Sequence, residues 1–253
     1  MAVYLKQFET QAAYEAAESG LILPNVSFTV DNNTVHYNPS SPVPPTPSHD
    51  YVEIGGVKWA TMNVGATSIT DYGLYFQWGD TSGYTASQVG SGTGKKYFGW
   101  ADYKYSNNGG SDASDMTKYN STDNLTTLEA SDDAATVNMG SGWRMPKEAD
   151  FNALSAATTN AWVTDYQGSG VNGRLFTDKN DSSKVLFFPA AGFCYDGSVD
   201  NVGSYGYCWS SSLSTSDVVR GRYLIFRSGD CSIGNSNRRN GFAVRGILDD
   251  SKS

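Results

Sequence analysis

The sequence predicts an α+β protein made of short strands, at least two helices and long loops. Aromatic residues make up 13% of the 253 residues and charged residues only 17%, and 27 residues are glycine. This aromatic, turn-rich composition is typical of a β-rich globular chain and not of a helical bundle or a disordered chain. Short apolar runs separated by Gly, Ser and Asn indicate the same class.

The first 38 residues predict a small N-terminal head. Phe8, Ala12 and Glu15 stand at helical spacing before Gly20, which predicts a short amphipathic helix over residues 6–19. Residues 26–37 alternate in polarity and predict a short β segment or hairpin that turns at residues 31–33. A unit of this size rarely holds a core alone, so we expect it to serve for attachment or oligomerisation.

A Pro-rich segment at residues 39–50 separates the head from the rest of the chain. Five of the eight Pro lie between residues 39 and 47. This composition is typical of a semi-rigid polyproline linker. The main domain is therefore expected at residues 51–248, followed by a tail at residues 249–253.

The main domain is expected to contain short strands set among long Gly-, Ser- and Asn-rich loops. Each candidate strand is rich in β-branched or aromatic residues and is bounded by turn-forming residues. The candidates are residues 57–61, 174–177, 185–189, 207–211, 223–226 and 242–247. Recognition residues usually lie on loops that a rigid scaffold carries, so this plan favours a binding protein.

Two helices are expected between these strands. Ser131 is a candidate N-cap for the first helix. Asp132 and Asp133 follow it at the positive end of the helix, which is expected to stop at Gly140. Pro146 suits the first turn of the second helix, which would place Phe151 and Leu154 on one buried face.

Charge and hydropathy exclude several classes of partner. The formal net charge of -8 argues against nucleic-acid binding and against membrane-surface binding. No stretch approaches the roughly 18 to 20 consecutive apolar residues of a membrane span, so no membrane insertion is expected. The first residues hold no basic leader followed by an apolar run, which predicts that no secretory signal is present.

The sequence offers few candidate residues for catalysis or for metal binding. Cys194, Cys208 and Cys231 show no CxxC or His-containing spacing, which supports neither a disulfide framework nor a zinc site. We therefore expect a protein that is not an enzyme and has no cofactor. A structural calcium ion is a possible exception, because one stretch is rich in carboxylates. Solvated loop acids are the favoured interpretation of that stretch, since it lacks EF-hand-like spacing. The acids are Asp102, Asp112, Asp115, Asp123, Asp132 and Asp133.

The C-terminal segment differs in composition from the rest. It holds six of the eight Arg, among Tyr, Ser, Asn, Asp and Gly: Arg220, Arg222, Arg227, Arg238, Arg239 and Arg245. Arg with aromatic and small polar residues is typical of paratopes, where rings and forked donors supply hot spots. By composition alone, an ordinary sheet edge with solvated Arg is an equal alternative.

Six motifs stand out in the main domain: VKWATMNVGA (57–66), DYGLYFQWGD (71–80), GWRMP (142–146), FPAAGF (188–193), GYCWSSS (206–212) and NGFAVRGI (240–247). Together they resemble a known family, the Fibrobacter succinogenes major paralogous domain, which is abundant in Bacteroidetes. They occur in order and cover nearly all of residues 51–248. The resemblance implies a C-type-lectin-like domain, of the group that includes the formylglycine-generating enzyme.

Some members of this family serve as variable proteins of diversity-generating retroelements, which mutate the adenines of AAC codons. Such mutation can yield most residue types but never Lys, Glu, Gln, Trp or Met. None of these types occurs among residues 210–248, although the rest of the chain holds all six Trp and all five Met. The resemblance therefore implies a variable region at about residues 205–240.

Among residues 210–248, six residues fit the family framework: Leu224, Phe226, Gly241, Phe242, Val244 and Arg245. The candidate ligand-binding positions are Tyr205, Tyr207, Cys208, Ser214, Val219, Arg220, Arg222, Tyr223, Ile225, Arg227, Asp230, Cys231, Ser232, Asn235, Asn237, Arg238 and Arg239. Cys208 and Cys231 are interpreted as sampled, exposed thiols without a structural role.

The sequence thus predicts a hypervariable receptor-recognition protein that binds a bacterial surface protein or glycan. A rigid core of Trp59, Trp78, Trp143, Trp209 and Phe188 would let exposed side chains change without unfolding the domain. The head resembles the openings of virion proteins from phages of gut Bacteroidales, which implies a place on a phage tail or capsid. The bacterial cell surface is the alternative location.

Three other functions are weighed against this one. A calcium-dependent carbohydrate-binding lectin or cell-surface adhesin is the first, although the usual Glu-Pro-Asn and Gln-Pro-Asp signatures are missing. An oxidase of the formylglycine-generating type would need a neighbouring cysteine pair that the sequence lacks. A purely structural decoration protein is the third.

Overall fold

The computed structural model describes residues 27–31, 34–38 and 49–249. The chain divides into two compact units, residues 1–48 and 49–253. In the first unit, β1 (Ser27–Asp31) pairs antiparallel with β2 (Thr34–Asn38), which confirms the expected hairpin. The helix expected at residues 6–19 lies outside the described residues, as do most of the expected linker and tail.

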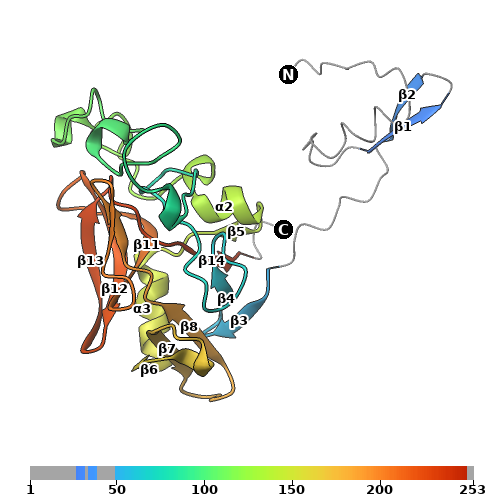
Figure 1. Ribbon diagram of the computed structural model, residues 1–253, viewed down its shortest axis with the longest axis vertical. Coiled ribbons are helices and arrows are strands. Elements are labelled where there is room, and N and C mark those ends of the chain that lie inside the picture. The colour runs from blue at the N-terminus through green and yellow to red at the C-terminus, as the bar shows by residue number, and fades with distance from the viewer. Residues whose placement is uncertain (1–26, 32–33, 39–48, 250–253) are drawn as a thin grey trace. The chain divides into compact units, whose positions relative to one another are not determined.

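The second unit is mixed and consists mostly of strands (Figure 1). One sheet has the order β3-β4-β14-β5, from β3 (Tyr51–Ile54), β4 (Val57–Asn63), β14 (Arg245–Leu248) and β5 (Trp143–Arg144). A second contains β6 (Thr158–Val163), β7 (Gly173–Asp178) and β8 (Val185–Pro189). A third contains β11 (Tyr205–Leu213), β12 (Arg220–Arg227) and β13 (Asp230–Asn237). The strands β9 (Phe193–Tyr195) and β10 (Ser198–Asp200) form a hairpin.

Two α-helices of the unit lie where helices were expected. They are α2 (Ala134–Met139) and α3 (Glu148–Ala157). Neither described helix is long and apolar enough to cross a membrane. Short 3-10 helices lie in the loops at η1 (Ala86–Gln88), η2 (Trp100–Asp102), η3 (Ala113–Asp115), η4 (Ala130–Asp132) and η5 (Tyr166–Gly168).

The starts of both helices differ from the expectation. The N-cap of α2 is Asp133 and not Ser131, because the Asp133 carboxylate accepts the backbone N–H of Thr136 at 2.9 Å. Ser131 lies in the preceding 3-10 turn. Pro146 precedes the N-cap of α3, which is Lys147, so it stands outside the first turn. The buried Phe151 and Leu154 and the stop of α2 at Gly140 are as predicted.

Every candidate strand overlaps an observed one, but several observed strands were not predicted from the sequence. The last candidate was too long, because Phe242 and Ala243 form only isolated bridges and Val244 lies in no strand before β14 begins at Arg245. The strand β13, with the sequence DCSIGNSN, has little intrinsic preference for β structure. It is a strand because eight consecutive residues pair with β12.

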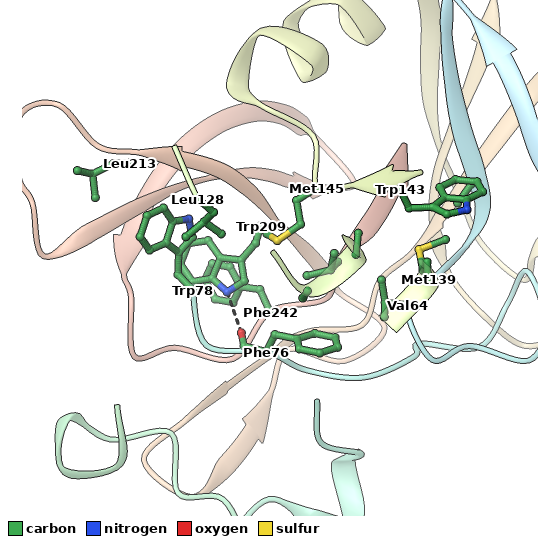
Figure 2. Packing of buried hydrophobic residues seen from close by; sticks show 14 of the residues in the cluster. Val64, Phe76, Trp78, Leu128, Met139, Trp143, Met145, Trp209, Leu213 and Phe242 are labelled. Carbon is green, nitrogen blue, oxygen red and sulfur yellow. Dashed lines mark hydrogen bonds between the residues drawn. The ribbon is translucent and has the colours of Figure 1, made fainter. Parts of the chain in front are cut away.

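The five residues expected to form the core are all buried. Trp59, Trp78 and Trp209 are 0% exposed, and Trp143 and Phe188 are nearly so. Trp78 and Trp209 pack with Phe242 and residues from α2 in one cluster (Figure 2). The indole N–H of Trp209 donates to the carbonyl of Phe76 at 2.8 Å, drawn as a dashed line in Figure 2. A buried indole whose donor is satisfied avoids the penalty of an unpaired polar group.

Arg245 joins two of the sheets from inside the core. Its side chain is fully buried on β14 and donates to Asn63 Oδ1 and to the carbonyls of Ala60 and Phe187, at 2.9 to 3.0 Å. Its guanidinium also lies 4.4 Å from the ring centre of Phe188. Burial lowers its pKa to about 10, so the group stays charged at neutral pH and its donors must remain paired.

We predict that Arg245→Met lowers the free energy of unfolding by about 3 kcal/mol, because it leaves buried carbonyls without donors. Urea titration followed by tryptophan fluorescence measures the loss. Arg220→Met, on an exposed side chain of β12, is the control and should leave the urea midpoint unchanged. Equal midpoints for the two variants would contradict the structural role of Arg245.

Candidate binding surface

The register of the β11-β12-β13 sheet separates the expected variable positions into two groups. In an antiparallel sheet, residues directly opposite each other point to the same side, and side chains alternate along each strand. Cys208 stands opposite Leu224, and Leu224 opposite Ile233. Tyr207 stands opposite Ile225, and Ile225 opposite Ser232. These two rows therefore lie on opposite sides of the sheet.

The side that carries Cys208, Leu224 and Phe226, here called the core face, packs into the domain. These three side chains are buried in one cluster with Trp59 and Phe188. Cys231 and Ile233 of β13 pack against the same cluster. The framework assignment of Leu224 and Phe226 thus agrees with their burial.

The side that carries Tyr205, Tyr207 and Tyr223, here called the tyrosine face, is partly open to solvent. Tyr205, Tyr207, Tyr223 and Ile225 are half-buried. Further along the same face, three polar side chains are exposed: Arg227, Asp230 and Ser232. Seven of the expected variable positions therefore share one accessible face.

Aromatic rings on this face join the rings of the β9-β10 hairpin. Tyr205 and Tyr207 lie nearly parallel, with ring centres 6.1 Å apart. Tyr207 lies 5.8 Å from Tyr223 and 5.0 Å from Phe193, and Phe193 lies 6.4 Å from Tyr195. We call these five residues the aromatic strip. Half-exposed rings held against one another present a large rigid contact area with little side-chain entropy to lose.

Phe193 and Tyr195 were missed by the sequence analysis. They lie outside the expected variable region, and FPAAGF was considered only as a family motif. The alternation of Phe193 and Tyr195 around the apolar Cys194 was the available signal, since it predicts one strand with an aromatic side and a buried side. That such a strand adjoins Tyr207 depends on long-range packing.

The chemistry of the strip is that of neutral phenols beside a cation. Burial raises the pKa of Tyr207 and of Tyr223, so both hydroxyls stay protonated and can donate hydrogen bonds. The guanidinium of Arg227 lies 5.7 Å from the ring centre of Tyr205 and donates to its hydroxyl at 3.2 Å. The strip can therefore offer stacking, donor and cationic contacts together.

Four other expected positions lie on the opposite side of the sheet. Arg222 pairs with Asn235, and Arg220 pairs with Asn237. All four side chains lie on the same side of the sheet as Leu224 and Phe226. Arg222 forms a bidentate ion pair with Glu148 at the start of α3, at 2.8 and 2.6 Å. These four candidate positions therefore do not share a surface with the tyrosine face, because strand alternation points them to the other side of the sheet.

Four further candidates are buried and cannot form part of an exposed surface: Cys208, Ser214, Arg238 and Arg239. Arg238 donates to the carbonyls of Lys118 and Tyr119, and its guanidinium lies 5.1 Å from the ring centre of Trp78. Arg239 forms an ion pair with Asp196. Arg238 thus binds the loop at residues 118–119, and Arg239 binds the turn of the β9-β10 hairpin. Val219 is half-buried beside them, and its carbonyl accepts the N–H of Arg238.

The interpretation of the cysteines as exposed, sampled thiols is wrong for Cys208. Cys208 is 2% exposed on the core face, and Cys231 is half-buried against the same cluster. Burial raises the pKa of Cys208 to about 12 and that of Cys231 to about 11. Both thiols are protonated at neutral pH, and Cys208 packs as a small apolar residue.

The carboxylates considered for calcium hold the loops together. Asp102 accepts the backbone N–H groups of residues 97–99, and Asp123 accepts those of residues 119, 120 and 125. Asp132 accepts hydrogen bonds from Lys104, Lys118 and Tyr119. Within the described part of the chain, no three His, Cys, Asp or Glu side chains are grouped so that they could hold a metal ion. The hydrogen bonds of Asp102, Asp123 and Asp132 give these three residues a structural role within the loops.

We predict that Gly206→Ala destabilises the sheet while Gly229→Ala does not. The ring of Phe226 lies across Gly206, and a Cβ there would stand 1.9 Å from the Phe226 ring, whereas a Cβ on Gly229 would meet nothing within 4 Å. Overpacking of this kind should lower the free energy of unfolding by about 2 kcal/mol. Thermal unfolding of the two variants tests this. A stable Gly206→Ala protein would mean that Phe226 does not pack across the sheet as described.

We predict that Asp132 makes stability depend on acid pH. Burial alone would raise the pKa of Asp132, but hydrogen bonds from Lys118, Tyr105 and Tyr119 outweigh it and hold the pKa well below 3.8. This stabilisation is present above about pH 4 and is lost as the pH falls through the lowered pKa. In Asp132→Asn the unfolding midpoint should fall at pH 7 and differ less from wild type at pH 2. An equal loss at both pH values would contradict the assignment.

No protein-family model, curated protein or solved structure matches the chain. The candidate surface is accordingly defined by the register, burial and ring contacts of residues 193–239. On this evidence the site is a half-exposed aromatic strip on one face of an antiparallel sheet.

Proposed function

We propose that the chain is a receptor-recognition protein that binds a bacterial surface molecule through the tyrosine face of the β11-β12-β13 sheet. In this proposal the domain is C-type-lectin-like and is the variable protein of a diversity-generating retroelement. Its place would be on a phage virion, attached through the N-terminal head. The order of the six family motifs in the sequence supports the assignment.

The observation that carries the proposal is the separation of the two sides of one sheet. Leu224 and Phe226 are buried on the core face, whereas Ile225 and Arg227, the alternate residues of the same strand, are accessible. Because neighbouring positions point to opposite sides, Ile225 and Arg227 can change in size and polarity with little effect on the core, whereas Tyr207 and Tyr223 on the same face also pack against it. This is the property that a sampled binding surface needs.

The residue types of the tyrosine face also suit recognition. Tyr and Arg are enriched among interface hot spots, and small polar residues such as Ser232 adapt to different ligands. Many copies on one particle would strengthen weak single contacts by avidity, by a factor of about 100 or more. A calcium-dependent lectin mechanism is not needed for stacking and hydrogen bonding of this kind.

The proposal predicts which double variants lose binding. Ile225→Asp with Arg227→Ala alters the tyrosine face, and Asn235→Ala with Asn237→Ala alters the opposite side of the same sheet. Fluorescently labelled full-length chain is incubated with a panel of Bacteroidales strains and analysed by flow cytometry. The first variant should bind at least about tenfold more weakly than wild type, and the second should stay within about twofold.

Circular dichroism establishes that both variants fold. Equal losses in the two folded variants would contradict the proposal, since binding would then not be confined to one side of the sheet. Failure of the wild-type chain to bind any strain of the panel would also count against it.

A further inference from the structure

The β9-β10 hairpin has one buried side and one accessible side. Cys194 and Val199 pair with each other and pack in a cluster with Phe98 and Ala191. The alternate residues point the other way: Tyr195 pairs with Ser198, and Phe193 pairs with Asp200. One side of the hairpin therefore carries Phe193, Tyr195, Ser198 and Asp200, which we call the hairpin face.

This face is held firmly in place. Arg239, which is almost fully buried, forms an ion pair with Asp196 in the hairpin turn, and its guanidinium lies 4.5 Å from the ring centre of Tyr195. The N–H of Gly197 donates to the carbonyl of Tyr97 at 2.6 Å. Tyr195 nevertheless remains 39% exposed. A rigid ring with an open side is a good platform for stacking.

A carboxylate with unused acceptor capacity lies on the same face, since Asp200 pairs with Phe193 two positions along the ladder from the Tyr195–Ser198 pair. Asp200 is exposed and accepts a hydrogen bond from the Ser198 hydroxyl at 2.7 Å. An ionised carboxylate has about four lone-pair sites. Asp200 can therefore accept two further donors from a ligand that lies on Tyr195.

We infer that the hairpin face binds a pyranose ring of a neutral surface glycan, the C–H groups of the sugar stacking on Tyr195 and its hydroxyls donating to Asp200. The inference rests on the proposed function, since it assigns a ligand class to one end of the same aromatic strip. Phe193 lies 5.0 Å from Tyr207 and connects the hairpin face to the tyrosine face. The side chains of the hairpin face lie outside residues 205–240, so sampling of that region would leave these side chains themselves unchanged.

Charge decides between the classes of ligand. A cationic side chain of a protein partner would have to stack on a ring that already has the guanidinium of Arg239 4.5 Å from its centre, and like charges repel. An anionic glycan would meet the exposed carboxylate of Asp200 on a chain with a net charge of -8, whereas Asp196 is already paired with Arg239. A neutral ligand rich in hydroxyl groups suffers neither penalty and uses both the ring and the carboxylate.

Saturation-transfer NMR of the full-length chain with a panel of neutral methyl pyranosides tests the inference. We expect saturation of sugar C–H protons with wild type and with Tyr195→Phe, which keeps the ring. Tyr195→Ala should abolish the signal, and Asp200→Asn should weaken the affinity at least about fivefold, since a carboxylate accepts stronger hydrogen bonds than an amide. Tyr51→Ala removes an exposed tyrosine from β3, distant in sequence from the hairpin, and should change nothing.

Absence of a signal with every pyranoside, or a signal that survives Tyr195→Ala, would overturn the inference. The same variants in the cell-binding assay separate this failure from failure of the proposed function. If Tyr195→Ala binds cells as wild type does while Ile225→Asp with Arg227→Ala does not, the tyrosine face binds the receptor and the hairpin face does not. If binding to cells survives protease treatment and is lost after periodate oxidation of the cells, the receptor is a glycan.

Discussion

The antiparallel register of β11, β12 and β13 is the constraint on which the surface of this protein depends. Each residue of β12 pairs with a residue of β13, and most also pair with a residue of β11, so the side of the sheet that a residue occupies follows from its position in these ladders. A shift of one residue would bury Ile225 and Arg227 and expose Leu224 and Phe226. The burial of Leu224 and Phe226 against Trp59 and Phe188 therefore keeps the tyrosine face in place.

Glycines allow aromatic rings to lie across this sheet. A Cβ on Gly206 would collide with the ring of Phe226, and one on Gly234 would collide with Tyr223. On both sides of the sheet, a ring thus covers the backbone of the neighbouring strand. These ring–glycine pairs add cross-strand contact that a side chain at the glycine position would block.

Buried arginines connect the sheet to the loops around it. Arg245 joins β14 to β4 and β8, Arg238 holds the loop at residues 118–119, and Arg239 holds the hairpin turn at Asp196. Several of their partners are backbone carbonyls, which bind the planar guanidinium at fixed positions. The cations near the binding surface accordingly differ in role: Arg227 is accessible, whereas Arg238 and Arg239 position the segments beside it.

Local pattern in the sequence determined the α+β class, the six strands with strong β propensity, both helices and the tryptophan core. Hydrophobic spacing and turn residues act over a few positions, so they are readable without a structure. The choice between the two sides of β12 and β13 depended on pairing partners far along the chain. The burial of Arg238 and Arg239 and the contact between Phe193 and Tyr207 likewise depended on segments distant in the sequence. Composition cannot distinguish a solvated arginine from one that carbonyls and rings enclose, because that difference arises only when distant segments pack together.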